Sequence, residues 1–122
     1  MAYAKTVMGG GFSAGSALAM GGGVATALTA AGTVQSDALA LGALGAHMIG
    51  TCASGAGVRI AAGAPGDETI IFNGGANACL VYPPVSAKVN ALSTNTAFTL
   101  ATGTACIVHC ISATQWLAVL SA

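Results

Sequence analysis

Short apolar stretches separated by turn residues fill the second half of the chain, from Gly57 onward. Val, Ile, Phe and Tyr dominate these stretches, which is the composition expected of β-strands about five to eight residues long. Gly, Pro, Asn, Asp and Ser stand between them, where they favour turns. The predicted strands are Gly57–Ala61, Glu68–Asn73, Ala78–Tyr82, Lys88–Leu92, Thr96–Ala101, Thr104–Ile111 and Gln115–Leu120.

The connections between these stretches are short. Gly74 to Asn77 (GGAN) separates Glu68–Asn73 from Ala78–Tyr82, and this pattern predicts a β-hairpin. Two prolines follow the second strand and end it, because proline has no N–H to donate to a ladder. Short strands at regular spacing favour antiparallel pairing in a sandwich or barrel.

The first half is richer in Gly, Ala, Ser and Thr. Ala46–Ala53 predicts one more strand, and Val24–Leu28 and Thr33–Ala40 are further candidates. Asp37–Leu44 is alternatively one or two helical turns with Asp37 as N-cap. The predicted fold class is therefore all-β, an antiparallel, jelly-roll-like β-sandwich over residues 24–122.

Two glycine clusters, Gly9–Gly11 and Gly21–Gly23, mark the N-terminal segment. Fixing so many glycines in a helix costs too much backbone entropy. We predict an extended Gly/Ala-rich arm over residues 1–23, held rigid by neighbouring chains, with a disordered tail as the alternative. Tyr3 and Phe12 are the candidate interface residues, since nothing near them provides a local core.

Charge is scarce. Charged residues make up 5% of the chain and cancel to a formal net charge of zero, whereas soluble proteins carry roughly a quarter. Such a chain has little material for a solvated surface, and zero net charge favours association. The surface is thus expected to be buried either against other protein or in a membrane.

The best membrane candidate is residues 16–31, an apolar run with Gly21–Gly23 in its middle. Each glycine costs about 1 kcal/mol in a helix interior, so assembly with protein is preferred over a membrane segment. No signal peptide is recognised, which predicts synthesis in a reducing cytoplasm. No basic patch points to nucleic acid.

The groups with reactive potential are four cysteines and two histidines. Cys106 and Cys110 share one strand face while His109 points to the other, which separates a thiol from a base. Buried thiols are the preferred interpretation for the cysteines, with disulfides and a metal site as alternatives. His47 and His109 have no evident orienting acid, so no catalytic residues and no cofactor are predicted.

Residues 66–122 contain the runs GDETIIFNGGANACLVYPP, KVNAL, NTAFTLATGTA and ATQWLAVLSA in this order. The pattern resembles small β-sandwich structural proteins of tailed bacteriophages, used as capsid decoration (cement) proteins or as fibre modules. The resemblance implies a virion surface protein that forms homo-oligomers, commonly trimers, and contacts the major capsid protein.

We therefore expect a capsid decoration subunit, made in the host cytoplasm and located on the virion surface, that stabilises the phage head without turnover. A head or tail fibre module that binds host glycans is the alternative. A small membrane-active protein built on the Gly/Ala segment is a third.

Overall fold

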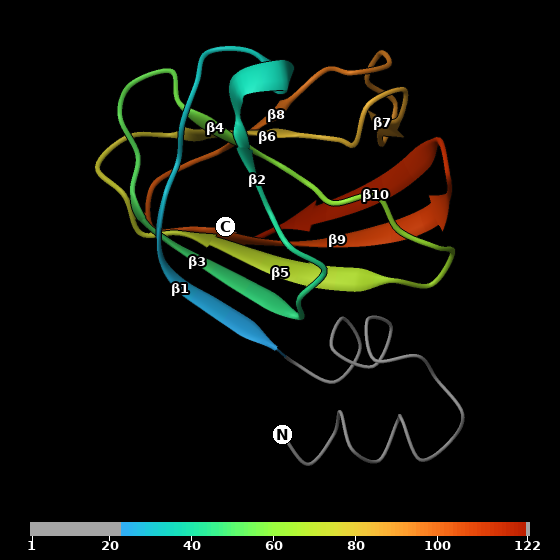
Figure 1. Ribbon diagram of the computed structural model, residues 1–122, viewed down its shortest axis with the longest axis horizontal. Coiled ribbons are helices and arrows are strands. Elements are labelled where there is room, and N and C mark those ends of the chain that lie inside the picture. Colours follow the sequence, from blue (N-terminus) through green and yellow to red (C-terminus); the bar gives the residue numbers. More distant parts are fainter. Residues whose placement is uncertain (1–22, 122) are drawn as a thin grey trace.

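The computed structural model describes residues 23–121, which form an all-β fold with two facing sheets (Figure 1). The predicted all-β class is confirmed. Among the described residues the helical structure is one short 3-10 turn, η1 (Gln35–Asp37). No helix in this range is long and apolar enough to cross a membrane.

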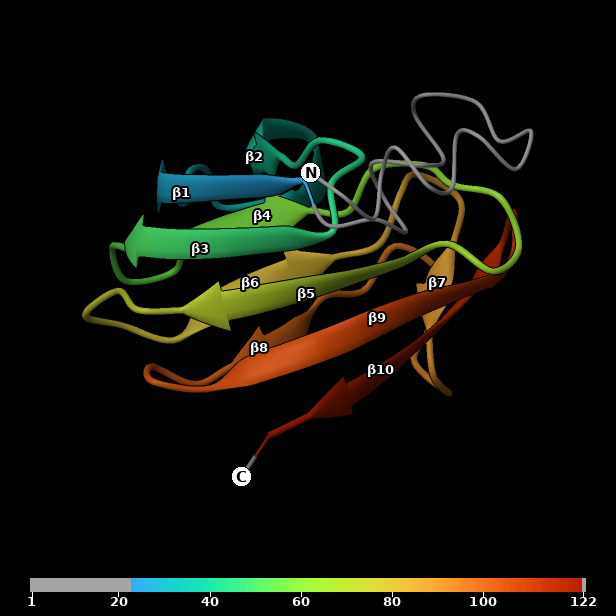
Figure 2. The ribbon, with the colours of Figure 1, turned by 90° about the horizontal axis from the view of Figure 1, so that it is seen from below.

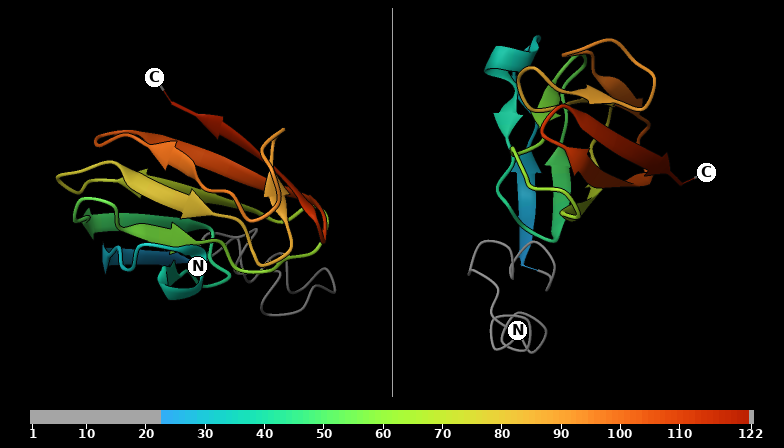
Figure 3. Two further views of the ribbon diagram at one scale, coloured as in Figure 1. Left: turned by 90° about the horizontal axis from the view of Figure 1, so that it is seen from above. Right: turned by 90° about the vertical axis from the view of Figure 1, so that its right-hand side faces the viewer.

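One sheet has six strands and the other has four. The six-stranded sheet lies in front in Figure 2, and Figure 3 shows both layers from above and from the side. Its strand order is β1 (Val24–Thr29), β3 (Ala46–Thr51), β5 (Glu68–Asn73), β9 (Ala105–Ser112), β10 (Gln115–Leu120) and β7 (Lys88–Val89). The four-stranded sheet contains β2 (Leu39–Ala40), β4 (Gly57–Arg59), β6 (Cys79–Tyr82) and β8 (Phe98–Leu100), in that order.

The chain alternates between the sheets as it runs from β1 to β6, which gives a solenoid-like winding. Successive strands within each sheet are parallel here: β1 to β3 to β5, and β2 to β4 to β6. The later strands close the fold with antiparallel pairs, β5 with β9, β9 with β10, and β6 with β8. Because the return path of each turn is a strand of the other sheet, parallel pairing needs no crossover helix.

The prediction of antiparallel pairing is therefore wrong for the pairs among β1 to β6 and for the pair of β7 with β10. The predicted hairpin is wrong as well. β5 and β6 lie in different sheets, and Gly74 to Asn77 carries the chain across the core between them. β5 and β6 each have one buried face. These faces pack against each other from opposite sheets, whereas the strands of a hairpin would lie next to each other in one sheet.

The segment around Asp37 also differs from the prediction. Of Thr33–Ala40, only Leu39 and Ala40 form a strand. Asp37 ends the 3-10 turn instead of beginning a helix, and its Oδ1 accepts the backbone N–H groups of Thr33 and Val34 at 2.9 Å. The carboxylate thus caps the preceding turn, and these two hydrogen bonds keep the pKa of Asp37 below its usual value.

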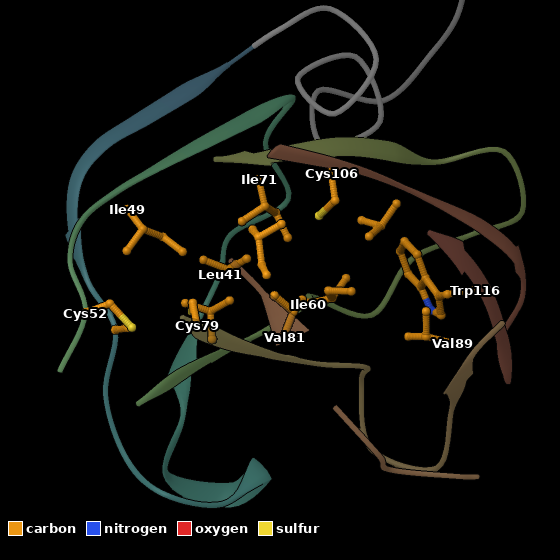
Figure 4. Close-up of a cluster of buried hydrophobic side chains, with 14 of the residues drawn as sticks. Leu41, Ile49, Cys52, Ile60, Ile71, Cys79, Val81, Val89, Cys106 and Trp116 are labelled. Carbon is orange, nitrogen blue, oxygen red and sulfur yellow. The ribbon is translucent and has the colours of Figure 1, made fainter. Parts of the chain in front are cut away.

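A single core lies between the sheets (Figure 4). Alternation along each strand sends every second side chain inward. Ile49, Ile71 and Val108 from the six-stranded sheet face Val81 and other side chains of the four-stranded one. Trp116 and Val89 lie together at one end of the core. Residues 1–22 of the predicted arm, with Tyr3 and Phe12, lie outside the described residues.

Candidate functional site

The outer face of the six-stranded sheet carries an apolar row that crosses five strands. Ala46 of β3 pairs with Val24 on one side and with Ile70 on the other. Ile70 pairs with Ile107 of β9, which pairs with Val119 of β10. Residues directly opposite each other point to the same face, so the row is continuous.

Further apolar side chains flank this row. Met48, Phe72 and Ala105 pair with one another on one side of it, and Leu117 lies on the other. Ile70 and Ile107 are each 45% exposed and Val119 is 70% exposed, values unusual for large aliphatic side chains in mid-sheet. We call this set the outer patch: Val24, Ala46, Met48, Ile70, Phe72, Ala105, Ile107, Leu117 and Val119.

The outer patch is hollowed over β9 and β10 and bordered by charge. A depression of about 320 Å³ is lined by Ile70, Ile107 and Val119 together with neighbouring residues. At one border, Nδ1 of His109 lies 2.8 Å from Oε2 of Glu68, and both side chains are partly exposed. An apolar centre with a polar border is the usual anatomy of a protein interface.

Charged side chains elsewhere stabilise turns. Oδ2 of Asp67 accepts the backbone N–H of Ala64 at 2.9 Å. Nη1 of Arg59 donates to the carbonyl oxygen of Gln35 at 2.9 Å. Asp37, Arg59 and Asp67 thus each hydrogen-bond to backbone atoms of a turn. They are not grouped into one site.

The two histidines have different surroundings, and neither is paired with a thiol. His47 is 1% exposed; its Nε2 donates to the carbonyl oxygen of Gly42, and its Nδ1 accepts the hydroxyl of Thr69 at 3.0 Å. His109 faces away from the buried Cys110, as expected from strand alternation. The expectation that neither histidine has an acidic partner is wrong for His109, because strand register places Glu68 opposite it.

Burial makes His47 a source of acid sensitivity. Loss of hydration lowers its pKa from the usual 6.5, so the unfolded chain binds the proton more tightly than the folded one. We expect the free energy of unfolding to fall as the pH drops through about 6.5 and below. Urea titrations near pH 7.5 and pH 5 measure this, and His47→Gln should remove most of the difference. An unchanged difference in His47→Gln would assign the acid sensitivity to other groups.

The four thiols are free and buried, as the preferred interpretation of the cysteines predicted. Burial raises the pKa of Cys79 to about 12 and that of Cys106 to about 11. A thiol with such a pKa is protonated at neutral pH and reacts slowly as a nucleophile while it stays buried. Within residues 23–121, no three His, Cys, Asp or Glu side chains are grouped so that they could hold a metal ion.

A small pocket beside His47 and Trp116 has a volume of about 30 Å³. This is enough space for about one water molecule.

The run from Asn73 to Asn77 has a structural role. Asn73 is completely buried; its Nδ2 donates to the carbonyl oxygens of Asn77 and Leu100, both at 2.9 Å, and its Oδ1 accepts the N–H of Gly75. Nδ2 of Asn77 donates to the carbonyl oxygen of Cys52. These amides fasten the crossing between the sheets.

Sequence reasoning placed the outer-patch residues in strands but did not single them out. The sequence signal for the outer patch was a pair of adjacent large apolar residues within a strand. Two strands contain such a pair, Ile70 with Ile71 and Ile107 with Val108. One of each pair must point away from a single core, because strand side chains alternate. Comparisons with models of protein families, with curated proteins and with solved structures found no match to this chain.

Proposed function

We propose that this chain is a non-enzymatic structural subunit that acts by burying its outer patch against other copies of itself in a homo-oligomer. The observation that supports this most directly is the continuous apolar row from Val24 to Val119 on the exposed face of the six-stranded sheet. In water such a face is unfavourable, and covering it releases about 25 cal/mol per Å² of apolar surface.

The size of the patch suits this role. Five strands spaced about 4.8 Å apart and about five residues long give a projected area of about 400 Å². Patches of this size on monomers are often functional. A standard interface buries about 800 Å² on each partner, so the patch supplies the apolar centre and its border the remainder.

Charge also favours another copy as the occupant. The chain has a formal net charge of zero, so copies do not repel one another at long range. The polar groups bordering the patch include Glu68 and His109, whose side chains lie 2.8 Å apart and hydrogen-bond to each other. A strongly basic or acidic partner would gain little from this surface.

Both edges of the six-stranded sheet carry features that discourage strand pairing, which favours its face as the contact surface. Strand β1 is interrupted by register shifts around Ala27, whose φ is +55°, and such bulges discourage edge pairing. At the other side, Oδ1 of Asn90 accepts the N–H of Ala118 at 2.9 Å and its Nδ2 donates to the Ala118 carbonyl at 3.3 Å. The Asn90 amide thereby takes the place of a neighbouring strand.

The resemblance to phage structural proteins extends this proposal. It supports a capsid decoration subunit on the virion surface, trimeric and in contact with the major capsid protein. In this proposal the two facing sheets serve as the sandwich module, with a solenoid-like winding in place of a jelly roll. Cosedimentation of the purified protein with assembled capsid shells tests the assignment, and a protein that stays in the supernatant contradicts it.

Ile107→Lys places a charge at the centre of the outer patch. We expect association to weaken at least about 100-fold, because an unpaired charge buried in an interface costs several kcal/mol. Since Ile107 points away from the core, the melting temperature of the subunit itself should change little. Size-exclusion chromatography with light scattering measures the shift toward monomer.

Val85→Lys is the matched control, because Val85 is 65% exposed in a loop outside the outer patch. The mass of the Val85→Lys oligomer should equal that of the wild-type oligomer. If Ile107→Lys and Val85→Lys have the same mass as the wild type, the outer patch is not the interface.

A further inference from the structure

Two buried thiols from different sheets meet at one end of the core. Cys52 directly follows β3 of the six-stranded sheet, and Cys79 begins β6 of the four-stranded one. They are 2% and 0% exposed. Figure 4 shows both at the end of the core opposite Trp116. Both side chains therefore approach the same space from facing layers.

Close backbone packing holds the two segments together. Sγ of Cys52 lies 3.5 Å from the carbonyl oxygen of Ala78, the residue before Cys79. The Cys52 carbonyl accepts the side-chain amide of Asn77 at 2.9 Å. A Cβ added at Gly75 would lie 2.7 Å from Cβ of Cys52, so the crossing segment wraps tightly over this residue.

Of the other three thiols, Cys52 affects Cys79 most. Burial is the largest cause of the raised pKa of Cys79, and the neighbouring Cys52 thiol is the next. Cys106 has a smaller influence on Cys79. Cys110 lies elsewhere on β9, where its Sγ is 3.2 Å from the carbonyl oxygen of Ser112.

We propose that Cys52 and Cys79 are a redox-sensitive pair that forms an intramolecular disulfide when the reduced protein meets a small-molecule disulfide such as oxidised glutathione. The bridge fastens the six-stranded sheet to the four-stranded one. The inference rests on the core and is independent of the proposed assembly through the outer patch.

Access to the pair runs through a surface turn. Cys52 is buried, but residues 53–55 after it are exposed and are closed by one backbone hydrogen bond, from the N–H of Ala56 to the carbonyl of Ala53. Local opening of this turn exposes Cys52 without unfolding the sheets. Oxidation should therefore proceed in the native protein, at a rate set by the opening.

The chemistry is thiol–disulfide exchange. The Cys52 thiolate attacks one sulfur of oxidised glutathione, forming a mixed disulfide and releasing one glutathione thiolate. The Cys79 thiolate then attacks the Cys52 sulfur, which breaks the mixed disulfide and releases the second glutathione. The two cysteines lose two electrons and two protons, which convert one oxidised glutathione into two reduced molecules.

The test is oxidation of the full-length, folded protein with oxidised glutathione, followed by alkylation and peptide mapping by mass spectrometry. We expect one linked pair of peptides, containing Cys52 and Cys79, with Cys106 and Cys110 alkylated. The melting temperature should rise by about 10 °C or more, because the bridge restricts the unfolded chain.

Cys52→Ala should abolish both the linked peptides and the rise in melting temperature, whereas Cys110→Ala, the matched control, should keep both. Circular dichroism verifies that each variant is folded before oxidation. Alkylation of all four cysteines after oxidation, or a bridge between a different pair, overturns the inference.

Discussion

Replacing Asn73 by aspartate should lower the free energy of unfolding by about 3–5 kcal/mol. The amide is completely buried and donates two hydrogen bonds, to the carbonyl oxygens of Asn77 and Leu100. An aspartate has no donor for them and brings a buried charge toward two carbonyl dipoles. Chemical denaturation followed by circular dichroism measures the loss.

Asn95→Asp is the control for this substitution. Oδ1 of Asn95 accepts the backbone N–H of Ser86 and the side-chain amide of Gln35, and a carboxylate accepts both equally well. This exposed variant should stay within about 0.5 kcal/mol of the wild type. Equal effects of the Asn73 and Asn95 substitutions would mean that the buried amide does not fasten the crossing between the sheets.

Gly57→Ala should cost about 2–4 kcal/mol. Gly57 lies in β4, between β2 and β6, and a Cβ there would be 2.6 Å from the carbonyl oxygen of Leu80. Its own N–H and carbonyl bond to Ala31, which fixes it from the other side. The backbone of β4 must move away from β6 to admit the methyl group. Thermal unfolding measures the cost.

Gly42→Ala provides the comparison, because the nearest atom to its added Cβ is Cγ of Leu44 at 3.7 Å. This contact is ordinary, and we expect the melting temperature to stay close to that of the wild type or to rise slightly. A Gly57→Ala protein as stable as Gly42→Ala would contradict the close approach of β4 and β6.

The strands could be predicted from the sequence, but their partners could not. Alternation places Thr69, Ile71 and Asn73 on one face, and the structure buries all three. Whether the next strand pairs beside this one or crosses to the other sheet depends on the direction in which Gly74 to Asn77 leaves β5. Glycine permits both paths, so the local pattern predicted a hairpin where the chain crosses the core.

The sequence predicted that the candidate site is a contact surface, but not which residues form it. Scarce charge predicted a surface made for contact, but the outer patch depends on strand order, which brings Ile70, Ile107 and Val119 into one row. The Glu68–His109 pair likewise depends on register between residues that are 41 positions apart. Burial of the cysteines was predictable from their apolar surroundings. The proximity of Cys52 to Cys79 was not predictable, because it arises only from the packing of one sheet on the other.

The central claim is that the outer patch is buried between copies of this chain. The most direct measurement is the native mass of the purified wild-type protein at micromolar concentration, by sedimentation equilibrium. We predict a homo-oligomer, with three chains as the expected number. A stable monomer of 11.6 kDa at that concentration would contradict the claim.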